Sequence, residues 1–130
     1  MTESMVNPAP APTARQPIST GANIVAWVLQ VLVALAFLAA GSGKLAGAQP
    51  MVATFAKIGV GQWFRVLTGL LEVCAAIGLF IPQTRFYAAI LLVLVMLGAI
   101  AAHLTVLGGN PTPAIVLLLL SGTIAYLRRP

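Results

Sequence analysis

Residues 64–81 read FRVLTGLLEVCAAIGLFI, an apolar run with one carboxylate, Glu72, near its middle. The chain has only two acidic residues, and roughly two helical turns of mostly apolar side chains separate Glu72 from either end of the run. A charge at bilayer depth costs about 2.5 to 3.5 kcal/mol, so an acidic residue inside a membrane segment indicates a functional site with a partner. Lys44 and His103 are the candidate partners.

The composition around this run is that of a membrane protein. Of the 130 residues, 60% are hydrophobic and only 7% are charged, whereas soluble domains carry about 25% charged residues. A helix of about 20 apolar residues crosses the roughly 30 Å of hydrocarbon in a bilayer, and the sequence supplies four such runs. The sequence therefore predicts an all-α protein, a four-transmembrane-helix bundle in contact with the lipid bilayer.

The positive charge follows the ends of these runs. The net charge is +5, and the basic residues are Arg15, Lys44, Lys57, Arg65, Arg85, Arg128 and Arg129. Scattered charges of this kind fix membrane orientation and meet anionic headgroups, and they form no basic patch that would indicate nucleic-acid binding. Counting them predicts that both termini are cytoplasmic and that Lys44, Glu72 and His103 lie towards the outer face. The membrane is expected to be a bacterial cytoplasmic membrane.

The chain begins with a stretch of different composition. Residues 1–21 are rich in Pro, Ala, Ser and Thr, which predicts a disordered tail before a membrane domain over residues 22–130. A secretory signal is the competing interpretation. The apolar run from Ile24 to Ala40 is longer than the usual signal core of about 7 to 15 residues, which favours an uncleaved membrane helix.

Five helices follow from the pattern. The four membrane helices are expected at about 23–45, 62–81, 85–107 and 111–127. A short amphipathic helix is expected at about 49–60, between the first and second membrane helices, with Pro50 at its start and Gly59 at its end. At about 11 residues it is too short to cross a bilayer, so we expect it to lie on the membrane surface or over the end of the bundle.

The end of the first membrane helix reads Gly41-Ser42-Gly43-Lys44, which invites comparison with a phosphate-binding loop. The full GxxxxGK[ST] pattern is absent, because Leu38 and Leu45 occupy its first and last positions. The glycines more simply predict the close approach of a neighbouring helix.

The second membrane helix has one face suited to packing. Small residues and one acid share it at helical spacing: Thr68, Gly69, Glu72, Ala75, Ala76 and Leu79. Cys74, the only cysteine, points away from Glu72, so we expect an apolar filler and no internal disulfide.

The ionisable residues are expected to meet at one end of the membrane. Lys44 and His103 lie within about one turn, 5.4 Å, of the same surface, and Glu72 lies about 12 Å deep from that side. Trp63 and Arg65 form an interfacial belt there. Two interpretations stay open: the charges pin the helix packing and His103 caps a carbonyl, or the three residues line a working pocket.

A working pocket of this kind supports two chemistries. An acid and a base at headgroup depth can relay protons to a lipid-soluble carrier such as a quinone, or shuttle a proton during isomerisation of an apolar substrate. We therefore predict Glu72, His103 and Lys44 as catalytic residues. Trp63, Arg65 and Gly69 are predicted to bind the ligand, and no metal site is expected.

The chain also resembles a known family. The motifs that carry the likeness are Gly41-Ser42-Gly43-Lys44-Leu45, Phe55, Ile58-Gly59, Trp63, Gly69-Leu70-Leu71-Glu72-Val73, Gly78-Leu79, Pro82, Met96-Leu97-Gly98-Ala99 and His103-Leu104. In order and spacing they look like the pattern of the DoxX-like family of small four-helix membrane proteins, over about residues 30–127. Lys44, Glu72 and His103 match the polar positions of that pattern.

The resemblance implies a function. Better-known members are membrane subunits of thiosulfate:quinone oxidoreductase or partners of separate redox enzymes in oxidative-stress complexes. This chain departs from an electron carrier, since it has no thiol pair, haem-ligand pair or flavin motif and so no intrinsic cofactor is expected. The expectation is a membrane subunit of such a redox system, with a bound quinone, a redox partner subunit or a second copy of itself. The alternatives are a stand-alone isomerase or cyclase using Glu72 and His103, or a non-catalytic scaffold.

Overall fold

All regular structure in the described part of the chain is helical. The computed structural model describes residues 7–10 and 17–130. The elements are α1 (Thr20–Ala46), α2 (Gln49–Ile58), α3 (Gln62–Gly78), α4 (Arg85–Ala102), the π-helical turn η1 (His103–Leu107) and α5 (Thr112–Leu127). The all-α prediction is confirmed, and so is the order of the five helices. Much of the predicted tail over residues 1–21 lies outside the described residues.

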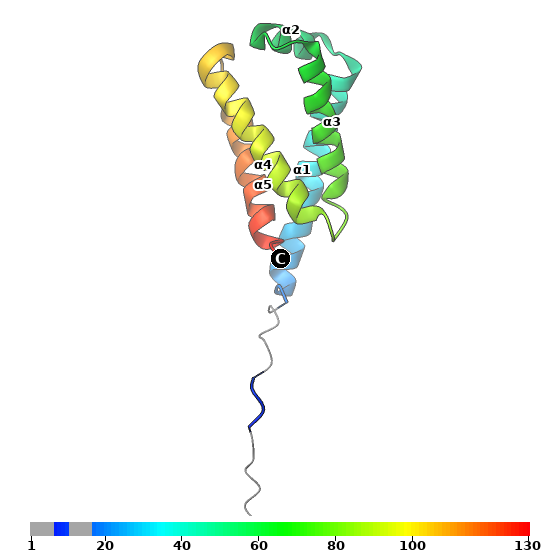
Figure 1. Cartoon of the computed structure of the whole chain (residues 1–130), viewed down its shortest axis with the longest axis vertical. Coiled ribbons are helices and arrows are strands. Elements are labelled where there is room, and N and C mark those ends of the chain that lie inside the picture. The colour runs from blue at the N-terminus through cyan, green and yellow to red at the C-terminus, as the bar shows by residue number, and fades with distance from the viewer. Residues whose placement is uncertain (1–6, 11–16) are drawn as a thin grey trace, which may run out of the picture.

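The helices run up and down between two ends of the molecule. Figure 1 shows α1 rising to the end where α2 lies across the top, α3 descending, α4 rising to η1, and α5 descending again. Helix α1 packs mainly against α3, and α4 mainly against α5; the two pairs meet where α3 contacts α4 and α1 contacts α5. The C-terminus therefore lies beside the start of α1 (Figure 1), at the end opposite α2.

Not every helix is long enough to cross a bilayer alone. Helix α1, with 27 residues, and the continuous segment Arg85–Leu107, with 23, meet the length and composition of a span. Helices α2 and α3 together could form a third, although they are bent by 118°. Helix α3 ends three residues before the predicted Ile81, where the Thr84 hydroxyl donates to the Gly78 carbonyl at 2.9 Å. By this measure the described chain has two or three candidate spans, and the predicted count of four is not confirmed.

Local sequence signals place the helix ends. Ser19 caps α1, its hydroxyl accepting a hydrogen bond from the Ala22 amide at 3.2 Å. Gly59 (φ 83°) ends α2, as predicted, and Gly61 (φ 124°) precedes α3. These backbone angles favour glycine, so the two residues allow the sharp bend between α2 and α3.

The core is built of small and medium apolar side chains, with many large ones left on the outside. Fully buried residues from α1, α3, α4 and α5 include Phe37, Leu79, Leu92 and Ile124. In contrast, Leu35, Ile77, Leu94 and Leu119 are each more than half exposed. An apolar exterior of this extent fits a membrane protein whose outer surface contacts lipid.

Helix α2 closes one end through its apolar face, which is one of the two positions that the sequence left open for it. Phe55 is its one buried residue, and its ring meets that of Phe64 at an edge, with the centroids 5.7 Å apart. On the other side, the Lys57 ammonium donates to the Leu107 carbonyl at 3.1 Å and links α2 to η1. This end of the molecule carries the candidate site.

Candidate functional site

The site is built where α1 and α3 come closest. A Cβ atom added at Gly69 would lie 3.0 Å from the Gly41 carbonyl oxygen, and one added at Gly41 would lie 2.7 Å from a methyl group of Val73. The predicted glycine-mediated approach is therefore confirmed for Gly41. Gly43 does not take part, because an added Cβ there would meet no atom within 4 Å.

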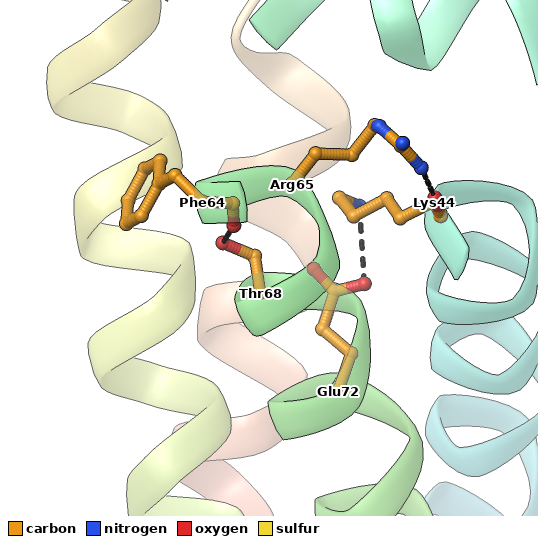
Figure 2. Close-up of polar contacts among 5 residues, drawn as sticks. All are labelled: Lys44, Phe64, Arg65, Thr68 and Glu72. Atoms are coloured by element: carbon orange, nitrogen blue, oxygen red, sulfur yellow. Dashed lines mark hydrogen bonds and ion pairs between the residues drawn. The ribbon is translucent and has the colours of Figure 1, made fainter. Parts of the chain in front are cut away.

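One turn beyond each of these glycines stands one member of an ion pair. Lys44 follows Gly41 by three residues, and Glu72 follows Gly69 by three. The Lys44 Nζ and Glu72 Oε2 atoms are 3.0 Å apart (Figure 2), and the two side chains are 13% and 2% exposed. The close helix contact thus brings the predicted pair together in a largely dry setting, where attraction between the charges offsets part of the cost of desolvation.

Arg65 fixes the backbone beside this pair. Its Nη1 donates to the main-chain carbonyl of Lys44 (Figure 2). Its Nε donates to Gln62 Oε1 at 2.8 Å. The Lys44 carbonyl also accepts a hydrogen bond from the Gly47 amide at 3.3 Å, and a cation near the last turn of a helix interacts favourably with the helix dipole. Arg65 therefore holds the end of α1 that carries Lys44.

The small-residue face of α3 is buried as predicted. Its inward members Gly69, Glu72, Ala75 and Ala76 are buried, and so is Leu79, the C-cap residue that follows the helix. The Thr68 hydroxyl donates to the Phe64 carbonyl at 2.8 Å (Figure 2), so it is engaged within its own helix and not with Glu72. Cys74 is exposed on the other side, which confirms its predicted direction.

His103 lies at the same end of the molecule but makes a different contact. It opens η1, and its Nδ1 lies 2.9 Å from the Gly108 carbonyl oxygen, to which it donates. Within the described chain, no hydrogen bond or ion pair joins His103 to Lys44 or Glu72. The contact matches the carbonyl-capping interpretation that the sequence left open.

Trp63 faces outward at the start of α3. It is 62% exposed, and its indole nitrogen donates to the Val60 carbonyl at 3.1 Å. Its ring meets the edge of Phe64, with the centroids 5.8 Å apart. This position fits the predicted interfacial belt, in which an aromatic side chain has one apolar and one hydrated side.

The sequence analysis missed a second polar cluster at the opposite end. Arg128 is only 6% exposed. Its Nε donates to Gln30 Oε1 at 2.8 Å and its Nη1 to Asn23 Oδ1 at 2.7 Å, while Gln30 Nε2 donates to the Leu79 carbonyl. The guanidinium also lies over the Trp27 ring, 5.5 Å from its centroid.

A signal for this cluster was present in the sequence. Gln30 is the one amide or charged side chain in the apolar run from Ile24 to Ala40, and such a residue requires a hydrogen-bond partner. The sequence indicated only that Arg128 stands at a helix end, where headgroups or water would surround it. The structure instead buries Arg128 against α1.

Metal ligation finds no support in the described part of the chain, where no group of three or more His, Cys, Asp or Glu side chains is placed to hold an ion.

A sequence model of the DoxX-like family matches residues 28–125, a stretch that includes Lys44, Glu72 and His103. Comparison with curated proteins gives no match, and neither does comparison with solved structures.

Proposed function

Because the chain belongs to the DoxX-like family, we propose that it is a membrane subunit of a quinone-linked or oxidative-stress redox system. In this proposal the Lys44–Glu72 pair binds the headgroup of a lipid-soluble ligand, a quinone. The observation that carries the proposal is the ion pair itself, 3.0 Å long and buried between α1 and α3. An ionisable pair at this depth is the kind of feature that membrane proteins retain for ligand or proton handling.

The chemistry of the pair suits a quinone carbonyl. An ammonium group has three N–H donors, and Lys44 directs one of them to Glu72 Oε2, so two remain for a ligand oxygen. The Lys44 side chain is 13% exposed, against 2% for Glu72, so a headgroup would reach the pair from the side of Lys44. The other carboxylate oxygen of Glu72 makes no hydrogen bond with a described residue. It can accept a proton, or a hydrogen bond from a hydroxyl group.

The pair would supply protons while a partner supplies electrons. Reduction of a quinone to a quinol takes up two electrons and two protons. In the proposed system the electrons come from a separate redox subunit, and each proton reaches the quinone oxygen through Lys44 and Glu72 from the adjacent membrane surface. Positioned acid and base groups accelerate such transfers by about 100-fold to 10,000-fold.

The isomerase or cyclase alternative depends on a different pair of residues. It requires Glu72 and His103 to reach one substrate, and Nδ1 of His103 is engaged with the Gly108 carbonyl. The scaffold alternative requires no ligand at all. For these reasons our proposal uses Lys44 and Glu72, and the experiment below separates the three functions.

We extend the proposal to the membrane arrangement. Four spans, formed by α1, α3, α4 and α5 with α2 on the surface, would place both termini in the cytoplasm. The position of the C-terminus beside the start of α1 supports this (Figure 1), as does the clustering of Arg85, Arg128 and Arg129 at that end. Protease-cleavable tags on both termini should resist external protease in spheroplasts, and cleavage of the C-terminal tag would contradict the arrangement.

Quinone retention tests the proposed function. The protein would be reconstituted in nanodiscs with menaquinone or ubiquinone, and bound quinone would be measured by native mass spectrometry. Replacing both members of the pair, Lys44→Gln with Glu72→Gln, should reduce retention about tenfold, since hydrogen bonds to charged groups contribute about 1.5 to 3 kcal/mol. The control Lys57→Gln removes one positive charge at the same end and should leave retention unchanged.

Each other outcome counts against the proposal. If the wild-type protein retains no quinone, or if the double variant retains as much as the wild type, the pair is not a quinone site. Retention of a different apolar metabolite that is lost on Glu72→Gln and on His103→Gln would favour the isomerase. Association with a redox subunit that survives every one of these substitutions, without any bound ligand, would favour the scaffold.

A further inference from the structure

Three arginines line one hollow at the end of the molecule opposite α2. The hollow has a volume of about 390 Å³ and is lined by Arg85, Arg128 and Arg129 together with apolar parts of Ile18 and Tyr126. Arg85 begins α4, and the other two arginines follow the end of α5. Arg85 lies 43 positions before Arg128 in the sequence, yet both contribute positive charge to the same hollow.

Arg128 is the buried member of the three. Two of its nitrogens bond to Gln30 and Asn23, but its Nη2 is buried and has no hydrogen-bond partner among the described residues. Burial, and then the like charge of Arg85, lowers the pKa of Arg128. An arginine in this setting keeps its charge, so the hollow has a poorly solvated cation in its wall.

The described residues supply no acidic side chain to balance this charge. Glu72 is the one acidic side chain in the described ranges, and it pairs with Lys44 at the other end. Arg85 is half-buried, and its side chain makes no hydrogen bond or ion pair with a described residue. Arg129 donates to the Tyr126 carbonyl, and its guanidinium lies 4.0 Å from the centroid of the Tyr126 ring.

We propose that this hollow binds a phosphate group, and that the phosphate belongs to the headgroup of an anionic phospholipid. Guanidinium groups match phosphate oxygens in a two-pronged geometry, and several of them around one hollow favour an anion where no described residue adds a carboxylate side chain. The apolar walls at Ile18 and Tyr126 suit the glycerol and the first carbons of a lipid. The position at the ends of two apolar helices places the hollow at headgroup level.

The start of α4 adds to this preference. The Arg85 amide donates to the Ile81 carbonyl at 2.9 Å, but Thr84, the N-cap residue, makes no side-chain hydrogen bond to the first turn. A helix N-terminus carries about half a positive charge and stabilises anions. The proposed phosphate site lies at the other end of the molecule from the Lys44–Glu72 pair and does not depend on the function proposed for that pair.

Lipid binding to single-charge variants tests the site. The full chain would be purified in a neutral detergent and titrated with phosphatidylglycerol or phosphatidylcholine, with binding measured by native mass spectrometry. The wild type should bind phosphatidylglycerol several times more tightly. Arg85→Gln should weaken this binding about fivefold, the contribution of roughly one favourable charge at a lipid surface. It removes no hydrogen bond to a described residue, and Lys57→Gln, which removes one positive charge at the opposite end, is the control for net charge.

The source of the phosphate is tested by a second titration. Inorganic phosphate would be added to the protein in phosphatidylcholine nanodiscs, and the Tm measured. A rise in Tm in the wild type that is absent from Arg85→Gln would show a phosphate site filled by the free ion, whereas a rise with phosphatidylglycerol alone would show a lipid site. Equal binding of the two lipids with no effect of phosphate, or an equal response in Arg85→Gln, would overturn the proposal.

Discussion

The two ends of the molecule both bury a positive charge, but they balance it in different ways. At the α2 end, Lys44 meets Glu72 at 3.0 Å, and the charges cancel inside the protein. At the terminal end, the hydrogen bonds of Arg128 to described side chains go to the neutral amide oxygens of Gln30 and Asn23, and Arg85 adds a second charge of the same sign. Neutral oxygens can orient a guanidinium, but they cannot neutralise it.

This difference indicates what each end can accept. A balanced pair with spare N–H donors suits a neutral polar ligand such as a carbonyl compound, because an added net charge would leave one ion uncompensated. An arginine cluster to which the described residues add no acidic side chain suits an anion. The comparison also predicts that substitutions at the two ends affect stability by different mechanisms, which the following variants separate.

The largest effect is expected from breaking the balanced pair. Lys44→Met leaves the Glu72 carboxylate, 2% exposed, without its partner, and loss of one member of a buried pair costs about 3 to 5 kcal/mol in the free energy of unfolding. The double variant Lys44→Met with Glu72→Leu removes both charges and should recover most of that loss. Unfolding in mixed micelles, followed by circular dichroism, measures both. Equal losses in the single and double variants would contradict a charge-balanced site.

A smaller effect is expected at the terminal end. Arg128→Met removes hydrogen bonds to Gln30 and Asn23 but leaves no charge buried, so the cost should be about 1.5 to 3 kcal/mol. The substitution also relieves repulsion from Arg85, and the loss should therefore shrink at low ionic strength relative to high. Arg129→Met, on the exposed neighbour, is the control and should change the free energy of unfolding by less. A loss for Arg128→Met equal to that for Lys44→Met would erase the predicted contrast.

The smallest effect is expected at the helix crossing that holds the pair. Gly69→Ala places a Cβ 3.0 Å from the Gly41 carbonyl oxygen. Overpacking lowers the free energy of unfolding by about 1 to 3 kcal/mol, whereas the better helix propensity of Ala raises it by about 1 kcal/mol. We therefore expect a net loss of about 1 kcal/mol. Gly43→Ala has open space around the new methyl group and should stabilise α1 by up to about 1 kcal/mol. A loss for Gly43→Ala as large as that for Gly69→Ala would show that the crossing is not tight.

Much of the candidate site could be predicted because it depends on local patterns. Helical spacing placed Gly69 and Glu72 on one face of α3, and the glycine at position 41 indicated the neighbouring helix. The pairing of Lys44 with Glu72 followed because few ionisable residues occur in the apolar runs. His103 was expected to join them, but its local contact with Gly108, five residues away, depends on the π-helical turn that the sequence pattern did not indicate.

The sequence by itself determined the helical class, the order of the helices and the choice of Glu72 as the unusual residue, since apolar periodicity and the rarity of charge are properties of the chain alone. Only the tertiary structure decided which groups balance which charges. Arg128 and Gln30 are 98 positions apart, and the hollow shared by Arg85 and Arg128 exists because α4 begins where α5 ends. Contacts of this range depend on how whole helices pack, and no local pattern encodes that packing.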